Sequence, residues 1–242
     1  CGPGDIALNL LLFTDSDRLQ RNQIAVRDDR LQHMLEVLRA APGDEIRVGE
    51  IGGLMGTGSI LSLDCEQAVL DIELREPPPD KLPLTLIMAL PRPKMLRRIL
   101  RSAAESGVRE LHLLNSYRVE KSYWQTPVLE AGTMREYLLQ GLQQSRDTAL
   151  PQVSCHRRFR PFVEDDLPGL LAGNRALLAQ PGDHPPCPRG PGEETTLVVG
   201  PEGGFIPYEV EKLQQAGCTA VSLGPRILRV ENAVAVLLGR LF

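Results

Sequence analysis

Two stretches near the end of the chain decide the fold: TLVVGPEGGF at residues 196–205 and AVSLGPRILRVENAVAVLL at residues 220–238. Each starts with an apolar run of strand length, continues into a loop that contains glycine and proline, and leads into a segment with helical spacing. This order is typical of an α/β sheet with mainly parallel strands, in which ligands bind beyond the carboxyl ends of the strands. The two loops are therefore the first candidates for a binding site.

The same alternation of strands and helices extends back to the segment LTLIMAL at residues 84–90, and it predicts an α/β domain over residues 81–242. The preceding segment REPPPDKLP (75–83) marks a domain boundary, because three consecutive prolines fix φ and remove backbone donors. Residues 8–76 alternate in short runs that predict the strands of a small β-barrel. One short helix is expected there, with Leu31, Leu35 and Leu38 at helical spacing.

Local signals refine this prediction. The glycine-rich run GGLMGTG (52–58) lacks the spacing of a phosphate loop and is expected to be a mobile hairpin tip. The Pro/Gly-dense segment 181–194 is expected to be an irregular surface loop. Helix ends are marked by residues with the usual capping preferences: Thr133 and Glu136 at capping-box spacing, Pro207 in a first turn, and Gly107 and Gly217 after last turns.

Composition sets the broad class. The chain has 242 residues, of which 42% are hydrophobic and 24% charged, and this excludes disordered, collagen-like and small disulfide-bonded proteins. No apolar run approaches the ~20 residues of a membrane span, so we expect no membrane association. The five cysteines, an odd number without a C-x-x-C pair, favour a reduced cytoplasmic chain. We give residues 1–7 no weight, because the chain starts with Cys rather than Met.

Metal binding is not expected. His184 and Cys187 in the Pro/Gly-dense loop are two candidate ligands at H-x-x-C spacing. A structural zinc site needs four ligands, so this pair predicts no metal.

The charge is unevenly distributed. The net charge is −4, yet residues 92–160 contain thirteen Lys or Arg against six Asp or Glu, a balance of +7, so the remainder carries −11. Of the 27 basic residues, 23 are arginines, which suit bidentate phosphate contacts, although GC-rich codon usage also explains such an excess. On the helix expected at 94–106, one face is basic and carries Lys94, Arg97, Arg98 and Arg101. The opposite face is apolar and carries Met95, Leu96, Ile99, Leu100 and Ala103. The basic face fits either a phosphate-binding surface or a solvated surface.

The second loop carries a charged triplet next to the start of the last helix. Glu231 lies in the expected first turn, where a carboxylate is favoured by the helix dipole. Arg226 and Arg229 are less easily explained, because cations near a helix N-terminus are disfavoured unless they have an anionic partner. Helix capping therefore explains Glu231 well and the two arginines less well.

The two loops together resemble a known family. VGPEGGF (199–205) and LGPRILRVENA (223–233) are very similar to the paired signatures of the ribosomal RNA small-subunit methyltransferases E, the RsmE family of the SPOUT superfamily. Weaker similarities to the same family occur in HMLEVLRAAPGDEI (33–46), SAAESGV (102–108) and QQSRDTALPQV (143–153). The chain departs from the family at Val230 and Asn232, which replace threonines, and at PRPKMLRR (91–98), which replaces a Lys-Gly-Asp turn.

The resemblance implies a fold, a cofactor and partners. The fold class is α/β (α+β overall), with a PUA-like β-barrel that binds RNA at 8–76 and a trefoil-knotted SPOUT domain at 81–242. The implied activity is S-adenosylmethionine (SAM)-dependent methylation of N3 of a uridine in 16S rRNA within the small ribosomal subunit, by a homodimer. The last helix has Val234, Leu237, Leu238 and Leu241 on one stripe, which is expected to face the core, and the resemblance implies that part of this helix lies in a dimer interface.

The resemblance also implies residue roles. Arg229 and Glu231 would be catalytic. The cofactor would be enclosed by three loops: Leu178, then Gly200, Pro201, Glu202, Gly203 and Gly204, then Leu223, Gly224, Pro225, Arg226, Ile227 and Leu228. RNA would be contacted by His33 and Arg39 of the barrel and by Arg92, Lys94, Arg97, Arg98, Arg118 and Lys121. Two alternatives stay open: a SPOUT methyltransferase that acts on transfer RNA, and a ribosome-binding member of the fold without turnover.

Overall fold

The computed structural model describes residues 9–190 and 192–242, which form two compact units. The first unit holds the described residues up to Asp80 together with Leu138–Leu150, and the second holds Lys81–Tyr137 and Pro151–Phe242. Each unit contains one six-stranded sheet. The mixed α/β class that the sequence predicts is confirmed.

The sheet of the first unit has the strand order β1-β4-β5-β6-β3-β2, and its pairs are antiparallel except for the parallel pair β1–β4. Its core contains the fully buried side chains of Phe13, Ile24 and Met34. The elements are β1 (Leu11–Phe13), η1 (Asp15–Asp17), β2 (Arg18–Gln20), β3 (Gln23–Val26), α1 (Asp29–Glu36), β4 (Glu45–Glu50), β5 (Met55–Leu63) and β6 (Ala68–Glu76).

Two local predictions in this unit need correction. Gly52 and Gly53 lie in the turn between β4 and β5, as predicted, but Gly56 and Gly58 lie inside β5, and a Cβ at Gly56 would collide with the carbonyl oxygen of Glu73 on β6. In α1, Leu31 is buried but Leu35 and Leu38 are exposed. The helix ends at Glu36, and Met34 takes the second core position.

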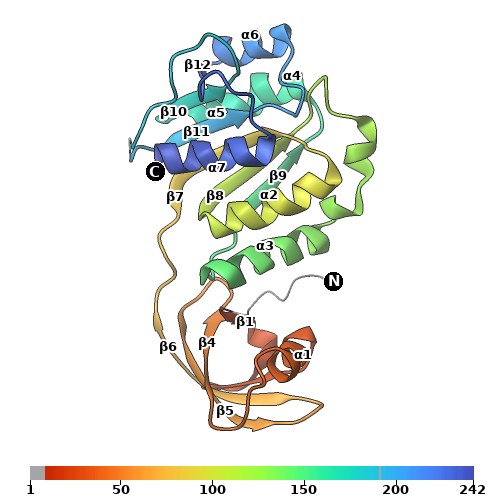
Figure 1. Cartoon of the computed structure of the whole chain (residues 1–242), viewed down its shortest axis with the longest axis vertical. Coiled ribbons are helices and arrows are strands. Elements are labelled where there is room, and N and C mark those ends of the chain that lie inside the picture. Colours follow the sequence, from red (N-terminus) through yellow and green to blue (C-terminus); the bar gives the residue numbers. More distant parts are fainter. Residues whose placement is uncertain (1–8, 191) are drawn as a thin grey trace. The chain divides into compact units, whose positions relative to one another are not determined.

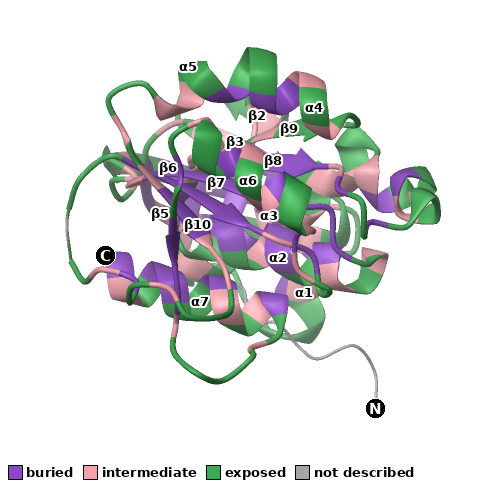
Figure 2. Cartoon of the chain, turned by 90° about the horizontal axis from the view of Figure 1, so that it is seen from above, coloured by how far each residue is buried: buried purple, intermediate pink, exposed green. Residues whose placement is uncertain are grey.

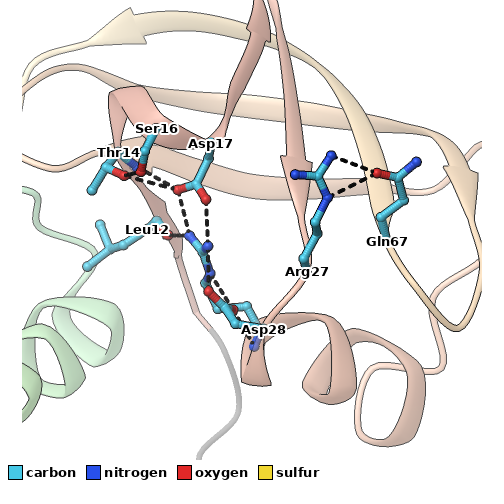
Figure 3. A network of polar contacts seen from close by, with 8 residues as sticks. Leu12, Thr14, Ser16, Asp17, Arg27, Asp28 and Gln67 are labelled. Carbon is cyan, nitrogen blue, oxygen red and sulfur yellow. Dashed lines mark hydrogen bonds and ion pairs between the residues drawn. The ribbon is translucent and has the colours of Figure 1, made fainter.

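An arginine between two carboxylates ties α1 to the start of the sheet (Figure 3). The Arg30 guanidinium donates to the Asp17 carboxylate at 2.8 Å, to the Asp28 carboxylate at 2.7 Å and to the Leu12 carbonyl oxygen at 2.8 Å. Burial alone raises the pKa of Asp17, but hydrogen bonds from Arg30 and Thr14 outweigh it, and the pKa lies below its ordinary value. The pKa of Asp28 is lowered in the same way, against burial, by Arg30.

Residues 138–150 join this unit through Thr148. Its carbonyl oxygen accepts from the Gly52 amide at 2.8 Å, and its Oγ1 donates to the Gly53 carbonyl oxygen at 2.6 Å. Thr148 is fully buried, so both polar groups are satisfied within the unit.

The sheet of the second unit has the strand order β12-β10-β11-β7-β8-β9, with parallel pairing throughout, as the sequence predicts. In this unit α2 and α7 lie on one face of the sheet, while α4 and α5 lie on the other (Figure 1). The strands of the sheet are largely buried, whereas the outer faces of these helices are exposed (Figure 2).

The bounds of the second unit's elements match the alternating pattern of the sequence. The strands are β7 (Leu82–Ala89), β8 (Val108–Leu114), β9 (Gln152–His156), β10 (Arg175–Ala179), β11 (Thr195–Val199) and β12 (Thr219–Val221). The helices are α2 (Pro93–Glu105), η2 (Lys121–Gln125), η3 (Pro127–Leu129), α3 (Ala131–Ser145, shared with the first unit), α4 (Phe159–Pro161), η4 (Phe162–Asp166), α5 (Leu167–Leu171), α6 (Pro207–Gln215) and α7 (Val230–Leu241).

Most helix ends are where the sequence predicts them. Pro207 is the first residue of α6, and Gly107 and Gly217 follow α2 and α6 with φ of +71° and +112°. Thr133 is not an N-cap, because α3 begins two residues earlier and its first carbonyl acceptor is Glu130.

The described residues of the loop at 181–194, which are 181–190 and 192–194, are irregular, as predicted, but they are partly held against the rest of the second unit. Pro186 forms an isolated parallel bridge with Ser222, and the Arg240 side chain donates to the Cys187 carbonyl oxygen at 2.6 Å. Cys187 itself is buried.

Candidate functional site

A cavity opens where β10, β11 and β12 end. The last residues of these strands, Ala179, Val199 and Val221, line its floor. We call it the strand-end cavity. It lies where the rule for parallel sheets places a ligand, and its largely apolar wall is typical of sites for small organic cofactors.

The loop after β11 forms one wall of this cavity. Gly200, Pro201, Glu202 and Gly204 line it. The loop turns sharply, because the Gly204 amide donates to the Pro201 carbonyl oxygen at 2.7 Å and Gly204 has a φ of +73°. Only glycine adopts this conformation without strain.

The loop after β12 forms the opposite wall. Gly224, with a φ of +107°, begins the loop, and Arg226, Ile227 and Leu228 continue the lining. Ile227 is 84% exposed, which is unusual for a large apolar side chain. Since it borders the strand-end cavity, Ile227 is available to cover an apolar ligand there.

A second, more open cavity adjoins the first. It is lined by basic residues of the α2 region and by the start of α7, and we call it the basic cavity: Arg92, Lys94, Met95, Arg98, Glu202, Ile227, Leu228, Arg229, Val230 and Glu231. Glu202, Ile227, Leu228 and Val230 line both cavities. A ligand in one cavity therefore lies next to a ligand in the other.

Glu202 connects the loop after β11 to the residue just before α2. Its Oε1 accepts from the Arg92 backbone amide at 3.3 Å and lies 3.6 Å from the Arg92 side-chain Nε. The start of α2, which carries the basic stripe, is thus in contact with the loop after β11.

The basic stripe of α2 has the predicted amphipathic arrangement. Lys94, Arg97 and Arg98 are exposed, and Leu96, Ile99, Leu100, Ala103 and Ala104 are buried on the other side. Arg101 differs from the other basic residues, because it is only half-exposed and its guanidinium lies 5.0 Å from the centre of the Tyr137 ring.

The two residues predicted to be catalytic face the basic cavity. Arg229 is the residue just before α7, with extended backbone (φ −64°, ψ 151°), and its side chain is exposed. Glu231 lies in the first turn of α7. The helix starts at Val230, so Glu231 is in its first turn, as predicted, and Arg229 is the loop residue just before it.

Most residues predicted to enclose a cofactor come together at the strand-end cavity: Gly200, Pro201, Glu202, Gly204, Leu223, Gly224, Arg226, Ile227 and Leu228 line it. Gly203 and Pro225 are in the same loops but are not among the lining residues. Leu178 is fully buried within β10, and the next three residues, Ala179, Gln180 and Pro181, line the cavity instead.

The residues predicted to contact RNA lie on several different elements of the two units. Arg92, Lys94 and Arg98 line the basic cavity, Arg97 is exposed on α2, and Arg118 and Lys121 are exposed after β8. Arg118 already has a protein contact, since its guanidinium donates to the Gly203 carbonyl oxygen. The remaining two residues, His33 on α1 and Arg39 just after it, belong to the first unit.

Sequence reasoning missed several lining residues. Gln180, Pro181 and Ser222 border the strand-end cavity, as do Ala233 and Leu237 of α7. Gln180 and Ser222 directly follow strands and Pro181 comes one residue later, so the rule about strand ends could have identified these three. Ala233 and Leu237 carry no such signal, because an apolar residue on a helix is normally a core residue.

Within residues 9–190 and 192–242, no group of three or more His, Cys, Asp and Glu could hold a metal ion. Cys187 is buried, and burial raises the pKa of its thiol, which keeps it protonated. In the part of the chain that is described, no helix combines the length and the apolar character needed to cross a bilayer.

Comparison with known proteins connects this geometry to a family. The family model described as an RNA methyltransferase domain matches residues 78–241. The chain is 28% identical over 233 residues to the ribosomal RNA small subunit methyltransferase E of Treponema pallidum, covering 93% of this chain and 87% of the relative. It is also 28% identical over 240 residues to the ribosomal RNA small subunit methyltransferase E of Mycobacterium bovis, and the match covers 89% of this chain and 85% of the relative.

A solved structure has a similar fold. The crystal structure of a ribosomal RNA small subunit methyltransferase E from Neisseria gonorrhoeae, bound to S-adenosyl methionine, matches with a TM-score of 0.74. The match covers 95% of both chains at 23% sequence identity. The similarity therefore extends through both units described above.

Proposed function

Since the chain belongs to the RNA methyltransferase domain family, we propose that it is a SAM-dependent methyltransferase that modifies N3 of a uridine in the 16S rRNA of the small ribosomal subunit. The observation that carries this proposal is the pair of adjoining cavities with a common wall at Glu202, Ile227, Leu228 and Val230. One cavity lies at the strand ends and has the largely apolar lining of a cofactor site, and the other is basic and open, which suits a nucleotide of RNA.

The residues of the strand-end cavity fit SAM. Gly200, Gly204 and Gly224 carry no side chain, so the adenosyl and methionine parts of SAM can approach the main chain of both loops closely. Apolar side chains of Ile227 and Leu228 provide surface for the adenine ring. When bound, SAM supplies a methyl group that is already activated on a sulfonium centre.

We assign charge stabilisation to Arg229. Methylation at N3 requires loss of the N3 proton, and negative charge then develops on the carbonyl oxygens of the uracil ring. A guanidinium at the basic cavity is suited to stabilise that charge as a preorganised electrostatic group. Glu231, two residues along the chain, either orients Arg229 or accepts the N3 proton.

RNA recognition is assigned to both units. In the second unit the proposed contacts are Arg92, Lys94, Arg97, Arg98, Arg118 and Lys121, and in the first unit they are His33 and Arg39. The proposed fold classes are a PUA-like barrel for residues 8–76 and a trefoil-knotted SPOUT domain for residues 81–242. Both rest on the family signatures in the sequence.

A homodimer and a place of action complete the proposal. The exposed side of α7 presents Ala235, Val236, Gly239 and Phe242, an apolar and mostly small surface that favours close helix packing against a second copy. Because the proposed substrate is the small ribosomal subunit, the enzyme would act in the cytoplasm, and its chemistry requires no metal.

The proposal is tested by incubating the chain with methyl-labelled SAM and small subunits that lack the modification, followed by nucleoside analysis. We expect labelled 3-methyluridine in 16S rRNA. Label that appears only in transfer RNA would favour a tRNA methyltransferase. Binding of subunits without any label would favour a ribosome-binding protein, for which the substitution of threonines by Val230 and Asn232 would be the first explanation to test.

A further inference from the structure

A buried carboxylate connects the loop after β11 to a distant part of the second unit. Glu209, in the first turn of α6, is only 3% exposed. Its Oε2 accepts from the Ile206 backbone amide at 3.0 Å, and its Oε1 accepts from the Tyr117 backbone amide at 2.7 Å. Both oxygens are therefore satisfied by main-chain donors.

The first of these hydrogen bonds belongs to the helix. Ile206 precedes α6 and has no side-chain acceptor, so Glu209 alone satisfies a free amide at the helix start. The second hydrogen bond is not needed by the helix. It reaches the loop that follows β8, 92 residues away in the sequence.

The residue after Tyr117 makes a second contact with the same loop. The Arg118 guanidinium donates to the Gly203 carbonyl oxygen. A Cβ at Gly203 would lie 3.0 Å from Arg118 Cδ, so the absence of a side chain at Gly203 allows this close approach. The loop is thus held at Gly203 and at Ile206, on either side of Gly204.

We infer that Glu209 and Arg118 are positioning residues for the cofactor: the contacts Tyr117–Glu209 and Arg118–Gly203 hold the wall formed by Pro201, Glu202 and Gly204 in the conformation that binds SAM. This inference rests on the proposed function and deepens it. Neither residue lines the strand-end cavity, so each acts on the cofactor through the loop rather than by touching it.

The first experiment compares Glu209→Gln with the unchanged chain. The amide keeps the size of the side chain but has one acceptor oxygen in place of two, so one main-chain amide loses its partner. We expect about 10-fold weaker binding of SAM in calorimetry, because a lost hydrogen bond to a buried charged group corresponds to roughly that factor. With small subunits as substrate, the KM for SAM should rise by a similar factor, while kcat at saturating SAM stays within about 3-fold.

Glu211→Gln is the matched control. Glu211 lies on the same helix, is exposed, and accepts from the Gln215 side chain at 2.9 Å. The same chemical change there should leave the Kd for SAM, the KM and kcat unchanged.

A second pair of variants tests the other contact. Arg118→Ala should raise the KM for SAM, and Arg118→Lys, which retains a donor for the Gly203 carbonyl oxygen, should restore most of the affinity. Because Arg118 is exposed, neither change should prevent folding, and this keeps the test informative if Glu209→Gln folds poorly.

Two results would overturn the inference alone: SAM affinity unchanged in both Glu209→Gln and Arg118→Ala, or activity reduced only in proportion to the folded fraction with an unchanged KM for SAM. Failure of the unchanged chain to bind SAM would instead overturn the proposed function, and the inference with it.

Discussion

Arg229 occupies the junction between the loop after β12 and α7. Its backbone is extended, its side chain is exposed, and it lines the basic cavity, whereas its neighbours Leu228 and Val230 line both cavities. A side chain in this position can act on the acceptor base without holding the cofactor. We therefore expect Arg229→Ala to lower kcat by about 100-fold or more, the scale seen when a preorganised charge-stabilising group is removed.

The same substitution should leave the Kd for SAM within a few fold. Calorimetry with SAM and methyl-transfer assays on small subunits measure the two effects separately. Arg229→Lys is the control for charge alone, and partial activity in it would show that the planar guanidinium contributes beyond its charge. Equal loss of cofactor affinity and turnover in Arg229→Ala would contradict this division of roles.

How far single residues can be predicted depends on how local their signal is. The glycines at 200–204 and 224 follow apolar strands, so strand-end rules and the family signature both identify them. Glu209 carries no such signal, because its partner at Tyr117 is 92 residues away and only the folded chain brings them together. Leu178 does not line the cavity, whose lining starts at the next residue, Ala179, where β10 ends.

At the scale of elements, the contact of α1 with η1 and β1 depends on one partly buried guanidinium, that of Arg30. Arg30 and Asp17 have side chains that are 19% and 15% exposed, whereas Asp28 is more open at 59%. Because hydrogen bonds lower the pKa of Asp17 below its unfolded value, this carboxylate binds fewer protons in the folded state. Its contribution to stability is therefore present above the unfolded pKa and is lost as pH falls through the folded pKa.

We expect Asp17→Asn to destabilise the first unit by roughly 2 kcal/mol near neutral pH, because it leaves Arg30 partly unpaired at a poorly solvated site. The loss should shrink as pH falls below about 4, where the unchanged carboxylate also becomes protonated. Amide hydrogen exchange in α1 and β3 measures this locally. Trp124, the single tryptophan, lies in the second unit, and its fluorescence serves as an internal control that should not change.

Asp15→Asn is the matched variant. Its side chain is 96% exposed and lies 3.6 Å from the Arg18 guanidinium, so its exchange rates should resemble those of the unchanged chain. A similar loss of protection in both variants, or a loss in Asp17→Asn that is independent of pH, would show that charge on Asp17 does not stabilise α1.

Elements were predicted well where their pattern is periodic and self-contained. The amphipathic spacing of α2 and the buried runs of β7 and β11 identify those elements directly. The signals failed where distant backbone decides the structure. Gly56 looked like part of a loop because glycine is common in turns, yet it is required by the close approach of β6, which the sequence around it does not reveal.

At the scale of the whole molecule, the most informative property is the segregation of charge. A chain with net charge −4 should not bind RNA strongly, but residues 92–160 carry +7, and α2 exposes Lys94, Arg97 and Arg98 on one face. A surface of this kind binds phosphates through release of counterions, which makes its affinity depend on salt. The alternative explanation is that GC-rich codon usage enriched arginine throughout the chain. In that case the basic face of α2 would not be needed for binding to the small subunit.

These two explanations differ in the salt dependence of binding to small subunits that lack the modification. If α2 contacts phosphate, the affinity of the unchanged chain should fall steeply with salt, and Arg98→Ala should reduce the slope of log K against log salt concentration by about 0.7 to 0.9. Arg75→Ala is the matched control, because Arg75 is exposed, pairs with Glu73 and lies outside the segment 92–160. An equal change of slope in both variants, or an affinity that does not vary with salt, would mean that the basic face of α2 is a solvated surface and that subunit recognition depends on other contacts.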